Sequence, residues 1–137
     1  MGAGKSHLAS SIGSRLSLLV VHTDDVVTPA NSSRPYEELV DYERLQTQIK
    51  KAAVLRLSVV VDGICLRNIL ARAGVSAAKY IYVKRMTEGG LWHDGFHLSS
   101  FEGDPGSTPG EPEQSDFMYH VEQRPHECSD YFFERIE

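Results

Sequence analysis

The first residues of the chain have the types and spacing of a phosphate-binding turn. The stretch Gly2–Ser6 matches the end of the motif Gly-x-x-x-x-Gly-Lys-[Ser/Thr]. In this motif, backbone N–H groups of a glycine-rich turn point at the phosphates of a nucleotide. The lysine reaches the β- and γ-phosphates, and the hydroxyl binds Mg²⁺. The sequence therefore predicts a site for ATP and Mg²⁺. The residues expected to contact the nucleotide are Gly2, Ala3, Gly4, Lys5, Ser6 and His7.

Aspartates follow two apolar segments of the chain. Asp24 and Asp25 come after residues 17–22, and Asp62 ends residues 57–62. An aspartate at the end of such a strand is a typical Mg²⁺ ligand in phosphoryl transfer, so we predict a metal site formed by Ser6 and Asp62. Either Asp24 or Asp25 could accept the proton of a substrate hydroxyl, and Lys5 would assist catalysis.

Each of these acids also has a purely structural interpretation. Asp62 could cap the helix that follows it, and Asp24 or Asp25 could form an Asx-turn. For one acid alone the structural interpretation is favoured. The joint placement of all three after predicted strands favours a functional site.

The apolar pattern predicts a single α/β domain over residues 1–137. Buried strands are predicted over 17–22, 57–62, 78–83 and 129–136, and helices over 5–16, 37–53, 64–73 and 113–123. Loops are predicted over 23–35 and, as a Gly/Pro-rich loop or lid, over about 86–112. Strands that alternate with helices indicate a mostly parallel sheet covered on both sides, with ligands bound at the carboxyl ends of its strands.

Composition excludes several classes of protein. The net charge of −5 over 137 residues argues against a protein that coats nucleic acid or binds anionic membranes, and no apolar run is long enough to span a bilayer. The two cysteines, Cys65 and Cys128, are expected to be buried in a reduced, cytoplasmic setting. His93 and His97 are four residues apart, but Gly95 between them and the lack of a third ligand argue against zinc.

The order of these motifs resembles the uridine-kinase-like branch of the P-loop kinases. The matching stretches are residues 2–6, 22–25, 62–64 and 80–83. The resemblance implies a three-layer P-loop fold and ATP-dependent transfer of a phosphoryl group to a hydroxyl of a small molecule, for example a nucleoside. It also implies that Asp24 is the catalytic base and that Arg124 lies in a loop bordering the adenine.

The chain departs from that family in ways that support an alternative. The first strand and the first glycine of the P-loop are missing from the sequence, and residues 86–116 contain no Lys or Arg where the family's lid carries arginines. Lys84, Arg85 and Arg124 are the nearby cations. The alternative is a non-catalytic or truncated P-loop protein that binds nucleotide weakly or not at all. An exposed sheet edge left by a missing strand would favour a homo-oligomer.

Overall fold

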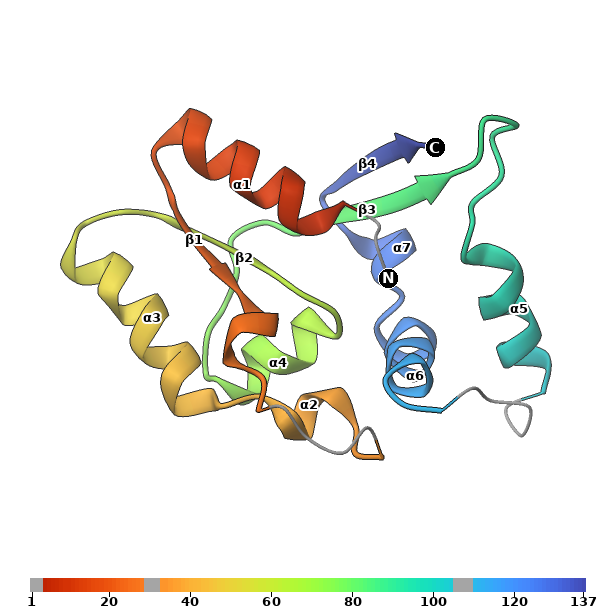
Figure 1. Ribbon diagram of the computed structural model, residues 1–137, viewed down its shortest axis with the longest axis horizontal. Coiled ribbons are helices and arrows are strands. Elements are labelled where there is room, and N and C mark those ends of the chain that lie inside the picture. The colour runs from red at the N-terminus through yellow and green to blue at the C-terminus, as the bar shows by residue number, and fades with distance from the viewer. Residues whose placement is uncertain (1–3, 29–32, 105–109) are drawn as a thin grey trace.

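The computed structural model describes residues 4–28, 33–104 and 110–137, which fold into helices and short parallel strands (Figure 1). This is the mixed α/β class predicted from the sequence. The elements in chain order are α1 (Lys5–Leu16), β1 (Leu19–His22), a 3₁₀ helix (Thr23–Val26), α2 (Tyr36–Leu39), α3 (Tyr42–Val54), β2 (Val59–Asp62), α4 (Leu66–Arg72), β3 (Ile81–Met86), α5 (Gly95–Gly103), α6 (Glu113–Gln123), α7 (Pro125–Cys128) and β4 (Tyr131–Ile136).

The strands form two separate parallel pairs. β1 pairs with β2, and the register places His22 opposite Asp62. β3 pairs with β4 along its whole length. Figure 1 shows α1 on one side of the β1–β2 pair and α3 on the other. We expected one continuous sheet, but no hydrogen-bonded ladder joins β2 to β3 in the part of the chain that the structure describes.

The main hydrophobic core lies between the β1–β2 pair and the helices α3 and α4. Leu45 of α3 and Ile69 of α4 are completely buried there, together with Val21 of β1. By contrast, every side chain of β4 is exposed, including Phe132 (48% exposed) and Phe133 (44% exposed). The β1–β2 half therefore has a well-packed core, whereas β4 has none on either face.

Several predicted elements are confirmed, two of them to the residue. The helices α1 and α6 begin and end where the apolar spacing placed them. β1, β2 and β4 are shorter than predicted but lie within their predicted ranges, whereas β3 begins at Ile81 rather than residue 78. Cys65 is buried as expected, but Cys128 is exposed, so the prediction for Cys128 was wrong.

The predicted helix over 37–53 is two helices, α2 and α3. The break occurs because Val40 leaves the helical conformation to form an antiparallel bridge with Val27. Asp41 then begins the second helix as its N-cap, since its carboxylate accepts a hydrogen bond from the Arg44 backbone N–H at 3.0 Å. Helical spacing continued across the break, so periodicity alone did not reveal it.

The predicted loop over about 86–112 contains the helix α5. Leu98 and Phe101 of α5 are buried, and the Phe101 ring packs on Phe117 of α6 with 5.5 Å between ring centroids. Glycines at both ends of α5 hid it from the sequence pattern, and residues 105–109 lie outside the described part. Within the ranges described above, no helix is both long enough and apolar enough to cross a membrane.

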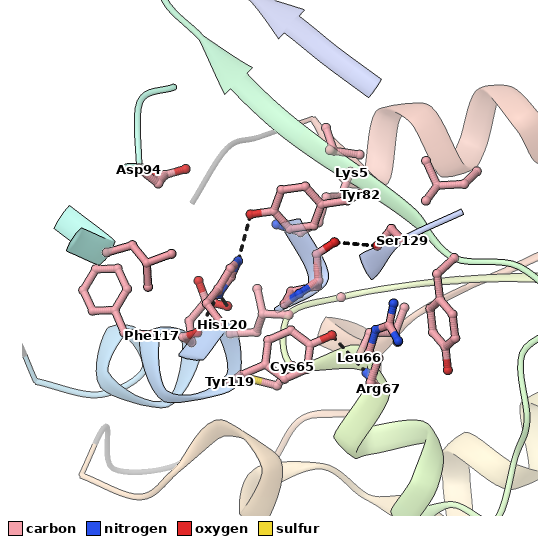
Figure 2. A pocket seen from close by; sticks show the side chains of 18 of the residues that line it. Lys5, Cys65, Leu66, Arg67, Tyr82, Asp94, Phe117, Tyr119, His120 and Ser129 are labelled. Atoms are coloured by element: carbon pink, nitrogen blue, oxygen red, sulfur yellow. Dashed lines mark hydrogen bonds and ion pairs between the residues drawn. The ribbon is translucent and has the colours of Figure 1, made fainter. Parts of the chain in front are cut away.

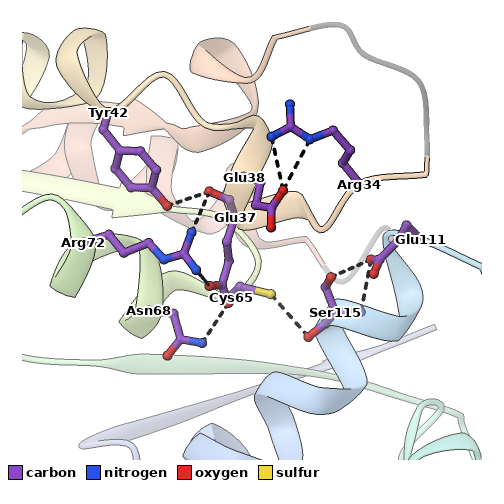
Figure 3. A network of polar contacts seen from close by, with 9 residues as sticks. All are labelled: Arg34, Glu37, Glu38, Tyr42, Cys65, Asn68, Arg72, Glu111 and Ser115. Carbon is purple, nitrogen blue, oxygen red and sulfur yellow. Dashed lines mark hydrogen bonds and ion pairs between the residues drawn. The ribbon is translucent and has the colours of Figure 1, made fainter.

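A polar network fixes α2 against α4 (Figure 3). Glu37 of α2 is at its centre: its carboxylate accepts a hydrogen bond from Asn68 Nδ2 at 2.7 Å and lies 3.4 Å from Arg72 Nη2. The Tyr42 hydroxyl donates to the Glu37 carbonyl oxygen at 2.7 Å. These bonds hold α2 and the neighbouring Tyr36 in place beside the end of β1.

Candidate functional site

The structure brings the two predicted Mg²⁺ ligands into direct contact. Ser6 lies in the first turn of α1, and Asp62 is the last residue of β2. The Ser6 hydroxyl donates a hydrogen bond to Asp62 Oδ2 at 2.7 Å, across 56 residues of sequence. Because Asp62 is only 9% exposed, its carboxylate is held at one position at the start of α1.

The other oxygen of Asp62 is bound by a residue that sequence reasoning missed. His22 Nδ1 contacts Asp62 Oδ1, and the parallel register of β1 and β2 sets the two residues opposite each other. With one oxygen bound by His22 and the other by Ser6, the Asp62 carboxylate has a fixed orientation. Both residues end predicted strands, which the sequence shows. That they lie opposite each other follows only from the pairing register of β1 and β2.

The turn before α1 has the conformation of a glycine-dependent loop. Gly4 has a φ of 82°, a left-handed conformation that side chains disfavour. A Cβ atom at Gly4 would also lie 2.9 Å from Arg135 Nη1 of β4. The Arg135 guanidinium therefore lies beside Gly4 at the start of α1. Lys84, Arg85 and Arg124 were the cations expected nearby, whereas Arg135 lies on β4, which is far from Gly4 in the sequence.

The predicted base Asp24 lies in the 3₁₀ helix after β1. The hydroxyl of the buried Tyr36 donates to Asp24 Oδ1 and lies 2.9 Å from Thr23 Oγ1. Burial first, and then the bond to Asp24, raise the pKa of Tyr36, so Tyr36 stays protonated and keeps donating. Asp25 is exposed. Among the described residues, no hydrogen bond joins Asp24 or Asp25 to Ser6 or Asp62.

A close contact nevertheless links the Asp24 turn to the Asp62 turn. Thr23 is completely buried, and a Cβ atom built on Gly63 would lie 1.9 Å from Thr23 Oγ1. The chain after β2 can pass the chain after β1 only because residue 63 has no side chain. Asp24 and Asp62 therefore belong to neighbouring turns at the carboxyl ends of the β1–β2 pair.

The other residues predicted to contact the nucleotide are less well placed to do so or lie outside the described residues. The guanidinium of Arg124 is held by Glu127, with two hydrogen bonds of 2.7 Å, and Arg124 is exposed. His7 is exposed on the first turn of α1. Gly2 and Ala3 lie outside the described residues. Of the predicted nucleotide contacts, Gly4, Lys5 and Ser6 lie at the start of α1, and nucleotide binding by them stays a prediction.

A cavity of about 180 Å³ lies next to this turn, between the two strand pairs (Figure 2). Lys5 lines it together with residues 63–67 after β2, Tyr80 and the first three residues of β3, and one side of α6. The Tyr82 hydroxyl points toward His120 and lies 2.8 Å from its Nε2 atom. Burial raises the pKa of Tyr82, so its hydroxyl remains neutral.

The donor set at Ser6 and Asp62 suits Mg²⁺. Magnesium prefers oxygen ligands and is usually bound through one or two protein groups, phosphate oxygens and water. A hydroxyl and a carboxylate at hydrogen-bond distance are compatible with that arrangement. No group of three His, Cys, Asp or Glu side chains that could hold a metal ion occurs among the residues that the structure describes.

Comparisons with known proteins add nothing to this geometry. No protein-family model, curated protein or solved structure matches the chain. Any assignment of function therefore depends on the residues and contacts described above.

Proposed function

We propose that this protein transfers a phosphoryl group from ATP to a hydroxyl of a small molecule, such as a nucleoside. The hydrogen bond between the Ser6 hydroxyl and Asp62 Oδ2 is the observation that carries the proposal. The two groups were singled out separately, one from a glycine-rich motif and one from the end of a distant strand. Their contact is what a shared Mg²⁺ site requires.

Each residue of the turn has a specific role in this proposal. Backbone N–H groups at Gly4 and at the start of α1 would cradle the phosphates, where the helix dipole favours negative charge. Lys5 would neutralise the β- and γ-phosphates, and Mg²⁺ held by Ser6 and Asp62 would supply charge neutralisation when bound. The fold that fits these roles is a three-layer P-loop domain with a mostly parallel sheet.

Asp24 is the proposed base for the substrate hydroxyl. Its carboxylate is oriented by a hydrogen bond from the Tyr36 hydroxyl. The same hydroxyl lies 2.9 Å from Thr23 Oγ1, and Thr23 packs against Gly63. Positioning a hydroxyl for attack and taking its proton are the main tasks left to the protein in phosphoryl transfer. Tyr36 would act by fixing the orientation of Asp24.

A second candidate is a P-loop protein that binds nucleotide without catalysis. Two observations favour it: the strands form two separate pairs, and residues 86–116 contain no Lys or Arg to clamp a transferring phosphate. Arg135 lies beside Gly4 but on β4, whose side chains are all exposed. The first candidate predicts turnover of ATP with an acceptor, and the second predicts none.

An ATP-consumption assay over a panel of nucleosides tests the proposal. We expect turnover that Asp24→Asn lowers by about 10²- to 10⁴-fold, the usual effect of losing a general base. Glu38→Gln, which removes an exposed carboxylate from α2, should leave the rate unchanged. Saturable Mg-ATP binding without turnover on any acceptor would favour the second candidate.

A further inference from the structure

The cavity between the strand pairs has an acidic end and a basic end. Asp116 of α6 and Asp94, the residue before α5, line it, and Lys5 lines it at the proposed phosphate-binding turn. Figure 2 shows Asp94 and Lys5. Among the described residues, the Asp116 carboxylate makes no hydrogen bond, and its ion pair with His120 Nδ1 spans 3.5 Å. Burial raises the pKa of Asp116, opposed by the charges of His120 and Lys5. Its charge is therefore only partly compensated.

The other cation in the cavity wall is already engaged. The Arg67 guanidinium lies over the Tyr80 ring, 4.2 Å from its centroid, and its Nη2 donates to the Cys128 carbonyl oxygen at 2.9 Å. Lys5 would be occupied by phosphates once a nucleotide is bound. Asp94 also has ion-pair partners, Arg85 Nη2 at 3.7 Å and His93 Nδ1 at 3.4 Å, so Asp116 is the less compensated of the two aspartates.

Aromatic side chains complete the acidic end of the cavity. Tyr82 of β3 and Phe117 of α6 line it, and the Tyr82 hydroxyl is paired with His120. Carboxylates combined with aromatic rings form the type of environment that binds organic cations, through charge and through cation–π contact. A cationic ligand would add positive charge beside Asp116, which a neutral or anionic ligand would not.

We propose that this cavity binds the phosphate acceptor and that the acceptor is an organic cation bearing a hydroxyl, with its positive charge beside Asp116 and Asp94. The inference rests on the proposed function, because the hydroxyl must face a nucleotide held at Lys5. Asp116 is a specificity-determining residue here. Asp24 remains the proposed base; it does not line the cavity itself but follows Thr23, which packs against the cavity-lining Gly63. The cavity would therefore select acceptors by their positive charge.

Nucleotide and acceptor should strengthen each other's binding. In the free protein, Lys5 contributes positive charge to the same cavity and opposes a cationic ligand. Phosphates bound at Lys5 remove that opposition. Because binding coupling is reciprocal, the acceptor should raise the affinity for nucleotide by the same factor.

The test is a calorimetric comparison of two ligands of the same shape, hydroxyethylpyridinium, which is a cation, and phenethyl alcohol, which is neutral. The titrations are run at about pH 8. We expect the cation to bind about ten-fold more tightly than the alcohol, the size of effect that a partly buried charge and a cation–π contact give. Asp116→Asn should abolish the difference.

Two further variants keep the result interpretable. Glu122→Gln removes an exposed carboxylate from the same helix, outside the cavity wall, and should preserve the ten-fold preference. Asp94→Asn should reduce it, which provides a second probe if Asp116→Asn does not fold. Equal binding of the two ligands, or a preference that both aspartate variants retain, would overturn the inference.

Nucleotide binding is measured separately on the same samples. If Mg-ATP binds but the cation shows no preference over the alcohol, the proposed function stands and the acceptor assignment fails. If the cation binds with the expected dependence on Asp116 but Mg-ATP does not bind, the cavity assignment stands and the kinase proposal fails.

Discussion

At the scale of single residues, Asp62 is the best-defined group of the site. Ser6 and His22 each bind one of its two carboxylate oxygens, and it is nearly buried. In the proposed reaction, a carboxylate held in this way would not need to reorganise when Mg²⁺ and nucleotide bind. Pre-organisation of this kind is the main source of rate in phosphoryl transfer.

Gly63, the next residue, is expected to be sensitive to the smallest substitution. In Gly63→Ala the new methyl would lie 1.9 Å from the buried Thr23 Oγ1, so one of the two turns must move. We expect a loss of about 1–3 kcal/mol in the free energy of unfolding, the usual cost of overpacking, measured by urea denaturation. Gly103→Ala is the control, since nothing lies within 4 Å of its added methyl. Equal stability of the two variants would contradict the close approach.

At the scale of elements, a cluster of rings joins β3, α6 and α7. His120 and His126 are stacked with 5.6 Å between ring centroids, and Trp92 packs on His126 at 5.2 Å. Burial, and then the neighbouring His120, lower the pKa of His126 below its ordinary value of 6.5. Its Nδ1 atom is buried without a hydrogen-bond partner among the described residues, so a proton there would not be stabilised.

This cluster should make stability depend on pH. Because the pKa of His126 is lower in the folded chain, the unfolded chain binds a proton first, and stability is lost as the pH falls below 6.5. Glu127, 3.5 Å from His126 Nε2, opposes the effect only partly. We expect the free energy of unfolding to fall between pH 7 and 5.5 in the wild type and less steeply in His126→Gln. Substituting the exposed His7 by Gln should keep the wild-type slope, and parallel slopes for His126→Gln and the wild type would refute this role.

The sequence predicted elements well where their signal was local. Periodicity and a Gly-Lys-Ser start gave α1, and continuous apolar runs gave β1 and β2. It failed where long-range contacts decide the conformation. Val40 breaks a periodic segment to bridge Val27, and α5 forms because Phe101 packs on Phe117. His22 and Arg135 reach the site through strand pairing and β4 packing, which one sequence does not reveal.

At the scale of the whole molecule, the site lies where the two halves of the structure meet. α1 packs on the β1–β2 pair, while a Cβ atom added to Gly4 at its start would lie 2.9 Å from Arg135 Nη1 of the β3–β4 pair. We expected one continuous parallel sheet, and the structure has two pairs with a cavity between them. Parallel strands are usually covered on both faces. The exposed β4 has the least packing of the four strands.

The central claim is that the segment Gly4–Ser6 binds nucleotide, and calorimetric titration of Mg-ATP tests it most directly. We expect saturable binding in the wild type and a loss of affinity of at least about ten-fold in Lys5→Ala, because a charge-assisted contact to phosphate contributes about 1.5–3 kcal/mol. Lys50→Ala, which removes an exposed lysine from α3, should bind as the wild type does. Absence of binding at millimolar Mg-ATP, or equal binding by Lys5→Ala and the wild type, would contradict a nucleotide site at Gly4–Ser6.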